Sequence, residues 1–495
     1  MADLLIRGAR VLTLAGAAGL EARDLDILIS GNRIARVGPA IATPQQVQIV
    51  QAGGKLIIPG LVNAHLHSSE MFFRGRYERM VLETWLNYAY PFFADEPIGL
   101  RLLYLRTMLV AIESIRSGVT MISDDFFDPP RHDLTRLSTV FQAYGDAGLR
   151  ANVSSGLMNL PYLDTLAFGR EVVPPQTQAR LEFPLLSAAD YVSYCDEVFR
   201  SLHASFDGRL RFMLAPSGPQ RCTADLMLAC RDLARAHRVP YHTHVLETRV
   251  QLVTGQRMFG GSLVRYMHDL GLLGPEVLMA HAVWVDDDDI ALMADTGVSV
   301  SYNAIANLKL GSGICPVRKL LDAGVNLGLG TDGASSNDTM RLFDVMRVAA
   351  LVQTTRSAQP ECWISAAEVL KAATSGGARA AMLDHETGTI APGKKADLTF
   401  LDLRRNTAFT PLSDAVRQLI YCENGASVSD VMVDGRFVLR DDRMTQINEV
   451  DILDEISGLV RDFLDRHAQV ERDNAFLLPA FAEISSRCSA FGGTA

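Results

Sequence analysis

Several features are scarce or absent in this sequence of 495 residues. No stretch of about 18 consecutive apolar residues occurs, which excludes a transmembrane helix. The seven cysteines are scattered and include no CxxC pair, so they predict reduced thiols in a cytosolic protein rather than a disulfide framework. Lysine is rare beside arginine, and none occurs between Lys55 and Lys309.

Clustered positive charge is also missing. The net charge is -10 and the basic residues do not gather in the sequence, which argues against nucleic acid or an anionic membrane surface as a partner. Asp3, Arg7 and Arg10 interrupt the apolar residues of the first segment, which therefore predicts a strand rather than a secretion signal. We expect a cytoplasmic protein. With 48% hydrophobic and 21% charged residues, the composition is typical of a globular enzyme.

Both ends of the sequence carry short strand patterns separated by glycine and polar turns, as in a small antiparallel sheet. Near the start these are "DLLIRGARVLTL", "LDILISGNRIARVG" and "QVQIVQAGGKLIIPG"; near the end they are "KKADLTFLDL" and "SVSDVMVDGRFVLRDDR". Two β-rich ends around a different middle predict one small β-sandwich domain built from both ends of the chain.

The middle of the sequence alternates between apolar or β-branched runs and helical stretches, which is typical of βα units around a parallel sheet. The runs cover residues 61–67, 119–125, 149–155, 210–216, 239–245, 277–283, 298–303 and 325–331. Eight strands with helices between them predict an α/β fold, a closed (β/α)₈ TIM barrel.

This organisation predicts four segments along the chain. They are residues 1–58 and 386–447 for the β-sandwich, 59–385 for the barrel, and 448–495 for a C-terminal helical extension. Two connections, 68–96 and 156–186, are unusually long. Long loops at the carboxyl ends of barrel strands usually cover a substrate, although a disordered excursion is the alternative.

The stretch "PGLVNAHLHSSEMFFRG" places two histidines at the end of the first barrel strand. Side chains at i and i+2 of a strand point to the same face, so His65 and His67 project together. Two imidazoles arranged in this way suit Zn²⁺ or Fe²⁺. Taken alone, the pair is equally consistent with two ordinary polar residues.

Further histidines and acids follow other predicted strands. "HTHVLET" closes strand 5 with His242, His244 and Glu247, "MAHAVW" closes strand 6 with His281, and "LGTDGASSND" closes strand 8 with Asp332. The carboxyl ends of the strands are the face on which barrel enzymes build their active sites. Residues without a shared role would be scattered, so the set predicts one metal-dependent site.

These motifs identify a resemblance. "PGLVNAHLHSSEMFFRG", "HTHVLET", "AHAVW", "NLKLGSGICPV", "LGTDGASSND" and "GTIAPGKKADLTFLD" resemble the amidohydrolase superfamily in its deaminase and chlorohydrolase branch. That branch includes S-adenosylhomocysteine, guanine and cytosine deaminases and the triazine hydrolases. The pieces span nearly the whole chain in the family's order, and their combination is specific although each piece alone is weak.

The resemblance implies a role for each of these residues. Glu247 matches the proton shuttle, His281 matches the histidine beside the attacking water, and Asp332 is both a metal ligand and a proton acceptor. His242 shares a strand face with His244 but is the histidine farther from the glutamate, so we expect it behind the ligands or in the core. The implied metal ligands are His65, His67, His244 and Asp332.

The lysine gap bears on the metal count. Binuclear members of the superfamily bridge two ions with a carboxylated lysine on strand 4, and no lysine lies between Lys55 and Lys309. The resemblance therefore implies one divalent ion per chain, with Zn²⁺ preferred and Fe²⁺ as the alternative. Such an ion lowers the pKa of bound water from about 15.7 toward 7.

The sequence gives fewer clues to the substrate. The adenosine-type motif after strand 4 reads roughly APHxPYxCS, whereas this chain has "APSGPQRCT" with Ser217 at the histidine position, which counts against an adenosine-type nucleoside. Gln220 could pair with a heterocycle or face solvent, and Trp85 could cap the ring or belong to the core. "IANLK" departs slightly from the family's usual "PxSNLK". The other candidate contacts are Asn307, Lys309, Ser336 and Asn337.

The resulting hypothesis is a mononuclear hydrolase that deaminates a small aromatic nitrogen heterocycle of the pyrimidine, purine base, pterin or triazine type. Glu247 protonates a ring nitrogen, hydroxide formed on the metal adds to the neighbouring carbon, and ammonia leaves. The same residues would serve displacement of chloride or cleavage of another C–N bond, which is the alternative. A catalytically inactive barrel used for binding or assembly is a remote alternative. We expect a homodimer or homotetramer.

Overall fold

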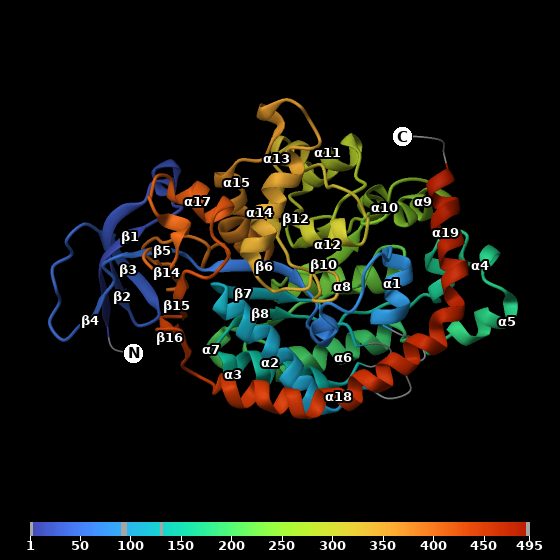
Figure 1. The fold of residues 1–495 in the computed structure, drawn as a ribbon. Coiled ribbons are helices and arrows are strands. Elements are labelled where there is room, and N and C mark those ends of the chain that lie inside the picture. The colour runs from blue at the N-terminus through green and yellow to red at the C-terminus, as the bar shows by residue number, and fades with distance from the viewer. Residues whose placement is uncertain (1–2, 91–96, 129–131, 492–495) are drawn as a thin grey trace.

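The computed structural model describes residues 3–90, 97–128 and 132–491. Eight parallel strands form the centre of the molecule, in the order β10-β11-β12-β13-β6-β7-β8-β9 (Figure 1). Their bounds are β6 Leu61–Leu66, β7 Val119–Asp124, β8 Arg150–Val153, β9 Leu210–Phe212, β10 Tyr241–Val245, β11 Val277–His281, β12 Ser299–Tyr302 and β13 Asn326–Leu329. Each falls within one of the eight predicted runs.

The two ends of this strand order meet and close the barrel. Beyond the end of β9, Leu214 forms a parallel bridge with Tyr241 of β10. The Leu214 N–H donates to the Pro240 carbonyl at 3.1 Å, and the Leu214 carbonyl accepts from the His242 N–H at 2.8 Å. The predicted (β/α)₈ barrel is therefore confirmed, although β9 is shorter than the run that predicted it.

Helices on the outside of the barrel cover the strands. These are α2 Leu100–Arg116, α3 Leu134–Ala147, α6 Ala188–Ser201, α8 Ala224–His237, α9 Arg249–Met258, α10 Leu263–Asp269, α11 Asp287–Thr296, α13 Val317–Asp322, α14 Leu342–Gln353, α15 Ala366–Lys371 and α16 Gly377–Ala380. Local sequence sets where they begin. For example, Asp286 and Asp289 form a capping box at the start of α11, which satisfies free N–H groups of its first turn.

Strands from both ends of the chain form the small domain. They are β1 Leu4–Val11, β2 Arg23–Ser30, β3 Arg33–Gly38, β4 Gln48–Gln51, β5 Lys55–Pro59, β14 Leu398–Asp402, β15 Val428–Val433, β16 Arg436–Arg440 and β17 Arg443–Met444. In Figure 1 the blue and the orange-red strands lie side by side, because β14 pairs with β5. The sheet is mixed rather than purely antiparallel, since β1 pairs in parallel with both β4 and β5.

The two long connections contain short helices. Residues 68–90 hold η2 Ser68–Phe73 and α1 Leu82–Ala89, and residues 91–96 of the first predicted connection lie outside the described residues. The second connection holds η3 Tyr162–Thr165, α4 Gly169–Val172, α5 Pro175–Gln178 and η4 Ala179–Leu181. Between β12 and β13, α12 Ala304–Lys309 follows the strand end directly. All of these elements except α5 carry buried residues, so they pack against the rest of the protein.

Helices follow the strands of the small domain. The helical elements after β14 are η7 Thr407–Phe409, α17 Ala415–Tyr421, α18 Glu449–Asn474, η8 Ala475–Leu477 and α19 Leu478–Ala490. The long helix α18 runs along the barrel beside α2 and α1 (Figure 1). Within the described residues, no helix is both long enough and apolar enough to cross a bilayer.

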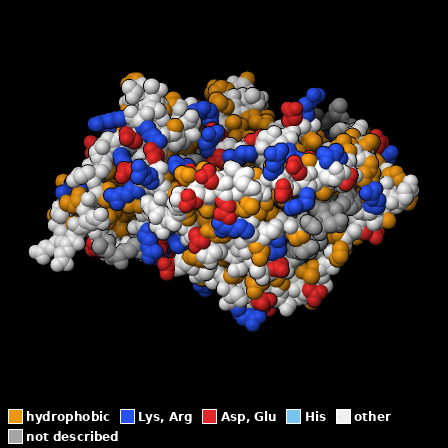
Figure 2. Space-filling model, turned by 60° about the horizontal axis from the view of Figure 1, so that its bottom comes forward, with side chains coloured by type: hydrophobic (Ala, Val, Ile, Leu, Met, Phe, Trp, Pro, Cys, Tyr) orange, Lys and Arg blue, Asp and Glu red, His pale blue; other side chains and the backbone are white. Residues whose placement is uncertain are grey.

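The surface carries mixed charges. On the face drawn in Figure 2, lysine and arginine side chains are interspersed with aspartate and glutamate rather than gathered in one field. All seven cysteines are free, which agrees with the expectation of reduced thiols.

Candidate active site

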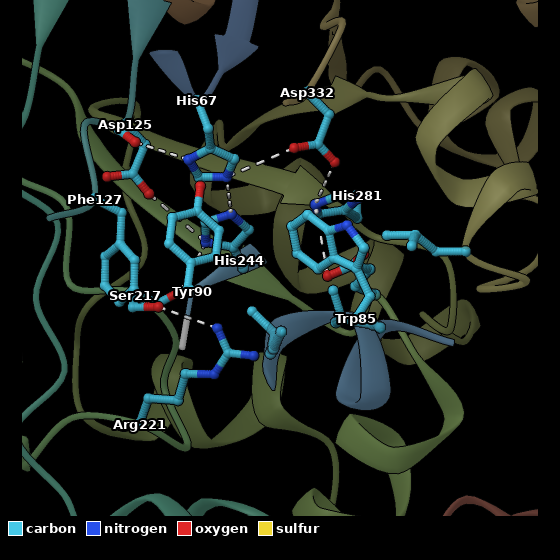
Figure 3. Close-up of a pocket in the computed structure, with 14 residues that line it drawn as sticks. His67, Trp85, Tyr90, Asp125, Phe127, Ser217, Arg221, His244, His281 and Asp332 are labelled. Carbon is cyan, nitrogen blue, oxygen red and sulfur yellow. Dashed lines mark hydrogen bonds and ion pairs between the residues drawn. The ribbon is translucent and has the colours of Figure 1, made fainter. Parts of the chain in front are cut away.

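The polar side chains predicted at separate strand ends converge at one end of the barrel. His65 lies in β6, His244 in β10 and His281 at the end of β11, while Asp332 follows β13. Nε2 of His65 is 3.4 Å from Oδ1 of Asp332, and Nε2 of His67 is 3.6 Å from the same oxygen. Each of these side chains is buried. Residues from four strands therefore meet in a single cluster, as Figure 3 shows for His67, His244, His281 and Asp332.

Hydrogen bonds fix the orientation of two of these imidazoles. Nδ1 of His67 lies 2.7 Å from the Asp125 carbonyl, and Nδ1 of His244 lies 2.8 Å from the Ser217 carbonyl. A carbonyl only accepts, so both rings donate from Nδ1 and present the Nε2 lone pair on the other side. These two Nε2 atoms are 3.2 Å apart. Two facing lone pairs at this distance require a proton or a cation between them.

The surroundings of His65 also indicate a bound cation. Both of its ring nitrogens are buried, and within the described residues neither makes a well-aligned hydrogen bond, although Nε2 lies 3.4 Å from Oδ1 of Asp332. Leaving a buried polar nitrogen without a partner costs about 1–3 kcal/mol, so such an atom calls for a ligand. Its Nε2 atom faces Asp332 beside the lone pairs of His67 and His244. The four donors are of the kinds that bind Zn²⁺ or Fe²⁺, and they fit a metal ion.

His242 lies behind this cluster. Its ring stacks on that of His65 with centroids 4.8 Å apart, and its Nδ1 atom is 3.9 Å from Oδ2 of Asp125. Among the described residues, it belongs to none of the groups of donor atoms close enough together to share an ion. This position agrees with the expectation that His242 supports the cluster from outside.

The cluster is rich in negative charge. Burial lowers the pKa of His67, but the carboxylates of Asp125, Asp332 and Glu70 outweigh it, and the pKa rises to about 9. Burial likewise opposes ionisation of Asp332, and the neighbouring histidines outweigh it, so that the pKa of Asp332 lies below its usual range. A divalent cation would neutralise this excess of buried acid.

Glu247 and His281 form the second part of the site. Oε2 of Glu247 lies 3.7 Å from Nε2 of His281, which in turn is 3.8 Å from Oδ2 of Asp332. Burial raises the pKa of Glu247 well above its usual range, and the charge of Asp332 raises it further. Both effects favour the protonated form of the Glu247 carboxyl. Nδ1 of His281 is 2.8 Å from Oδ1 of Asn307, so Asn307 orients the ring.

Backbone strain accompanies these residues. His281 has φ 78° and Asp332 has φ 63°, and Leu246, directly before Glu247, has φ 50°. Non-glycine residues adopt this left-handed region rarely and at a cost, and such residues concentrate at functional sites. Each of these three turns lies at the end of a barrel strand, where it aims a side chain inward.

A pocket opens over the cluster. Its lining combines aromatic and aliphatic side chains with the polar residues of the cluster. The residues are His67, Leu82, Trp85, Leu86, Tyr90, Asp125, Phe127, Ser217, Arg221, His244, Glu247, His281, Leu310 and Asp332 (Figure 3). The helix α1 supplies part of this wall, so the first long connection covers the site.

Comparison with known proteins identifies the family. Residues 56–438 match the pattern of the Amidohydrolase family. The chain belongs to this family. A 5'-deoxyadenosine deaminase of Methanosarcina mazei is 32% identical over 94% of the chain and 99% of the relative. A 5-methylthioadenosine/S-adenosylhomocysteine deaminase of Pelotomaculum thermopropionicum is 32% identical over 92% and 97%.

Solved amidohydrolase structures share the fold. An adenosine deaminase from Xanthomonas campestris with bound zinc has a TM-score of 0.81 and 27% identity, covering 94% of this chain and 99% of its own. An atrazine chlorohydrolase from Arthrobacter aurescens, complexed with zinc, has a TM-score of 0.83 and 26% identity, covering 92% and 100%. The resemblance to the deaminase and chlorohydrolase branch is thus confirmed, and the protein is an enzyme, a metal-dependent hydrolase of C–N bonds.

The predicted substrate contacts of this amidohydrolase lie in different places. Trp85 lines the pocket, and Asn307 stands behind His281. Gln220, Ser336 and Asn337 are buried but are not among the described residues that line the pocket. The amide of Gln220 packs beside Gly218, and Ser336 donates to the Gly333 carbonyl. Their role in binding substrate stays a prediction.

Sequence reasoning missed Tyr90, Asp125, Phe127 and Arg221 among the polar and aromatic pocket residues, and the aliphatic Leu82, Leu86 and Leu310. Tyr90 and Phe127 come from loops whose sequence has no regular spacing, and Arg221 stands in the turn after β9. Asp125 was detectable, because it directly follows β7 at the carboxyl face, as Asp332 follows β13. Lys309 lies outside the pocket lining and pairs with Asp338.

Proposed function

We propose that this amidohydrolase holds one divalent ion per chain and deaminates an aromatic nitrogen heterocycle. The observation that carries the proposal is the pair of Nε2 atoms of His67 and His244 facing each other beside Asp332. Glu247, whose pKa burial raises, lines the same pocket. His65, His67, His244 and Asp332 would hold the ion. Zn²⁺ suits three imidazoles and one carboxylate, and Fe²⁺ is the alternative.

The absence of a lysine supports a single ion. No lysine lies between Lys55 and Lys309, and β9 begins and ends within that gap. The chain therefore has no residue on β9 that could carry the bridging carboxylate of binuclear relatives. A bound ion would supply Lewis acidity and make water nucleophilic near neutral pH.

The chain's own residues supply the proton transfers. Glu247, whose protonated form burial favours, would donate to a ring nitrogen and make the adjacent carbon electrophilic. Asp332, which stays ionised, would accept a proton from the attacking water. His281, oriented by Asn307, would hold that water against the ring carbon. The departing amino group would leave as ammonia after protonation.

The walls of the pocket support a flat substrate. Trp85, Tyr90 and Phe127 present aromatic rings around an opening whose floor is the histidine cluster. Pyrimidine, purine base, pterin and triazine rings all fit this description, and the names of the relatives add adenosine-type nucleosides to the set. Each carries a ring nitrogen next to an amino-bearing carbon, as the proton transfer from Glu247 requires.

Displacement of chloride is the second candidate function. The likeness to an atrazine chlorohydrolase favours it, with a TM-score of 0.83. The same general acid and the same attacking water would serve, because the leaving group alone differs. The protein's residues do not select between the two leaving groups.

A screen of heterocycles tests both candidates. Metal-loaded protein would be offered amino- and chloro-substituted pyrimidines, purines, pteridines and triazines together with adenosine-type nucleosides, and ammonia and chloride would be measured in parallel. We expect ammonia from at least one amino-heterocycle. Chloride without ammonia would establish the second candidate, and neither product from any compound would refute both.

We also propose the segment boundaries at residues 58, 385 and 447, a cytoplasmic location, and a homodimer or homotetramer. Apolar side chains exposed on α18 support assembly. Val450 is 64% exposed and Leu459 is 47% exposed. The mass of the native protein in solution, measured by light scattering, tests this assembly.

A further inference from the structure

One cation in the pocket, Arg221, forms no ion pair with any described residue. Arg221 lines the pocket and is half-buried. Burial raises the pKa of Glu247 and of Glu83, and the charge of Arg221 opposes this rise at both carboxyls. The side chain of Arg221 makes one hydrogen bond, from Nη1 to Oγ of Ser217 at 3.1 Å. Its Nε and Nη2 groups make no hydrogen bond within the described chain. These two groups form the edge of the guanidinium that binds both oxygens of a carboxylate. Figure 3 shows this guanidinium below Ser217, at the margin of the cluster.

The position of Arg221 is fixed by its backbone. Its N–H donates to the Gly218 carbonyl at 2.9 Å, and its carbonyl accepts from Asn159 and Leu160 at 3.1 and 3.2 Å. These bonds tie the turn after β9 to the second long connection. The side chain is therefore directed at the pocket by a rigid turn, which reduces the entropy lost when it binds a ligand.

The guanidinium also lies close to the reacting end of the pocket. The Ser217 carbonyl that accepts from Nδ1 of His244 belongs to the same residue whose hydroxyl accepts from Arg221. Ser217 therefore contacts both Arg221 and the candidate metal ligand His244. A substrate group that pairs with Arg221 would therefore lie on the side of the pocket formed by Ser217 and His244.

The sequence around this turn supports a special role. Ser217 stands where the adenosine-type motif of related deaminases has a histidine. The hydroxyl of Ser217 accepts a hydrogen bond from the guanidinium of Arg221 and holds it in position.

Resting on the function proposed above, we infer that Arg221 selects the substrate by pairing with a carboxylate on the heterocycle, so that the enzyme acts on amino-substituted heterocyclic carboxylates. The Nε and Nη2 edge of Arg221 matches the two oxygens of a carboxylate. One carboxylate brings one negative charge, which one arginine balances. A phosphate would bring close to two charges into a pocket already lined by Asp125 and Asp332.

Matched substrates and variants test the inference. Each amino-heterocycle that releases ammonia would be compared with its ring-carboxylated and phosphorylated counterparts, using the metal-loaded enzyme. We expect the highest kcat/KM for the carboxylate. Arg221→Met keeps the length of the side chain and removes its charge, and Arg466→Met removes an exposed charge on α18 as the control.

Losing one partner of a charged pair in a binding site typically lowers affinity by about 30- to 1,000-fold. Arg221→Met should lower kcat/KM by such a factor for the carboxylate, mainly through KM, and by less than about threefold for the neutral parent. Arg221→Lys should recover part of the loss. Equal losses for both substrates, or a wild-type enzyme that prefers the neutral or phosphorylated compound, would overturn the inference.

A binding measurement separates this inference from the proposed reaction. Heterocyclic carboxylates that lack the amino group cannot be deaminated, and calorimetry reports their affinity without turnover. If the wild type binds them and Arg221→Met does not, Arg221 recognises the carboxylate even if no compound in the screen releases ammonia. If neither protein binds any carboxylate, while ammonia is released from neutral rings, the inference fails and the proposed reaction stands.

Discussion

Arg150, the first residue of β8, forms a buried ion pair with Asp397 of the small domain, with Nε 2.8 Å from Oδ2. Each of the two side chains is 3% exposed. Asp434, also of the small domain, lies 3.3 Å from Nη2 of the same arginine. One guanidinium thus joins the barrel to strands that come from the end of the chain.

Removing this arginine should destabilise the whole protein. Arg150→Met leaves the buried carboxylate of Asp397 without its cation, while Asp434 retains Lys395. Breaking a buried pair in this way typically costs about 3–5 kcal/mol in the free energy of unfolding. Arg10→Met, in an exposed pair with Asp24, is the control and should cost less than about 1 kcal/mol. Urea denaturation followed by circular dichroism measures both. Equal effects of the two substitutions would contradict a linking role for Arg150.

The sequence predicted the architecture because the barrel repeats one simple pattern. Each of the eight strands is a buried run, and helical periodicity follows each run, so local sequence is sufficient to recognise the unit. The sequence predicted that both ends of the chain form one domain, but not that β5 pairs with β14. The mixed sheet of this domain was not predicted, because β-strand patterns do not encode whether a neighbour runs parallel or antiparallel.

The candidate site was predictable to the same extent. His65, His67, His244 and Asp332 stand at strand ends, where position in the barrel determines direction. Arg221 was not predicted as a pocket residue. Its direction depends on a hydrogen bond to Ser217 and on backbone bonds to residues 159 and 160, about 60 positions away in the chain. Contacts of this kind follow from tertiary structure rather than from spacing.

The stability of the protein should depend on pH through His467 of helix α18. Nε2 of His467 lies 2.8 Å from the Tyr77 hydroxyl, and its ring stacks on Phe73 with centroids 4.2 Å apart. Burial lowers the pKa of this imidazole from 6.5 to about 4. Above pH 6.5 the histidine is neutral in both states, so its packing contributes fully to stability. As the pH falls from 6.5 to 4, the imidazole becomes protonated in the unfolded chain but stays neutral in the folded chain. The free energy of unfolding therefore decreases.

A variant isolates this contribution. Each unit of pKa difference corresponds to about 1.4 kcal/mol, so His467 accounts for a loss of at most about 3 kcal/mol between pH 7 and pH 4. His467→Gln retains a polar side chain that does not titrate. The unfolding free energy of the wild type should therefore fall more steeply below pH 6.5 than that of the variant. Parallel pH profiles for the two proteins would show that His467 is not the group responsible.

Metal content distinguishes the proposed centre from a binuclear one. Four ligands without a bridging lysine predict about one divalent ion per chain by elemental analysis of purified protein. Removing the ion with a chelator should lower Tm, because only the folded chain assembles the four ligands. Two tightly bound ions per chain would refute the mononuclear centre.

Two histidines of β10 should differ sharply in their effect on this metal. His244→Ala removes an Nε2 lone pair that faces His67, and should abolish both metal binding and activity. His242→Ala removes a ring that stacks behind His65, and should leave most of the metal bound with a smaller loss of activity. Elemental analysis and ammonia release measure the two effects together. If His242→Ala loses the metal while His244→Ala retains it, the ligand assignment is reversed.

Glu247 offers the sharpest test of the proposed reaction. Its pKa is raised by burial and by Asp332, which favours the protonated form that the ring nitrogen needs. Glu247→Gln keeps the size and the hydrogen-bonding capacity of the side chain but cannot donate and recover a proton. Because general acid–base groups typically contribute about 10²–10⁴ in rate, kcat should fall by that factor while metal content and Tm stay unchanged.

The size of the loss should also depend on the substrate. A ring that is already electron-poor needs less protonation before water adds, so Glu247→Gln should lose less activity on it than on an ordinary amino-heterocycle. Measuring kcat across a series of rings of increasing electron deficiency checks this dependence. Near-normal kcat on an ordinary ring would exclude Glu247 as the proton donor. Loss of the metal in the same variant would instead place Glu247 among the ligands, and the coordination by His65, His67, His244 and Asp332 would then have to be revised.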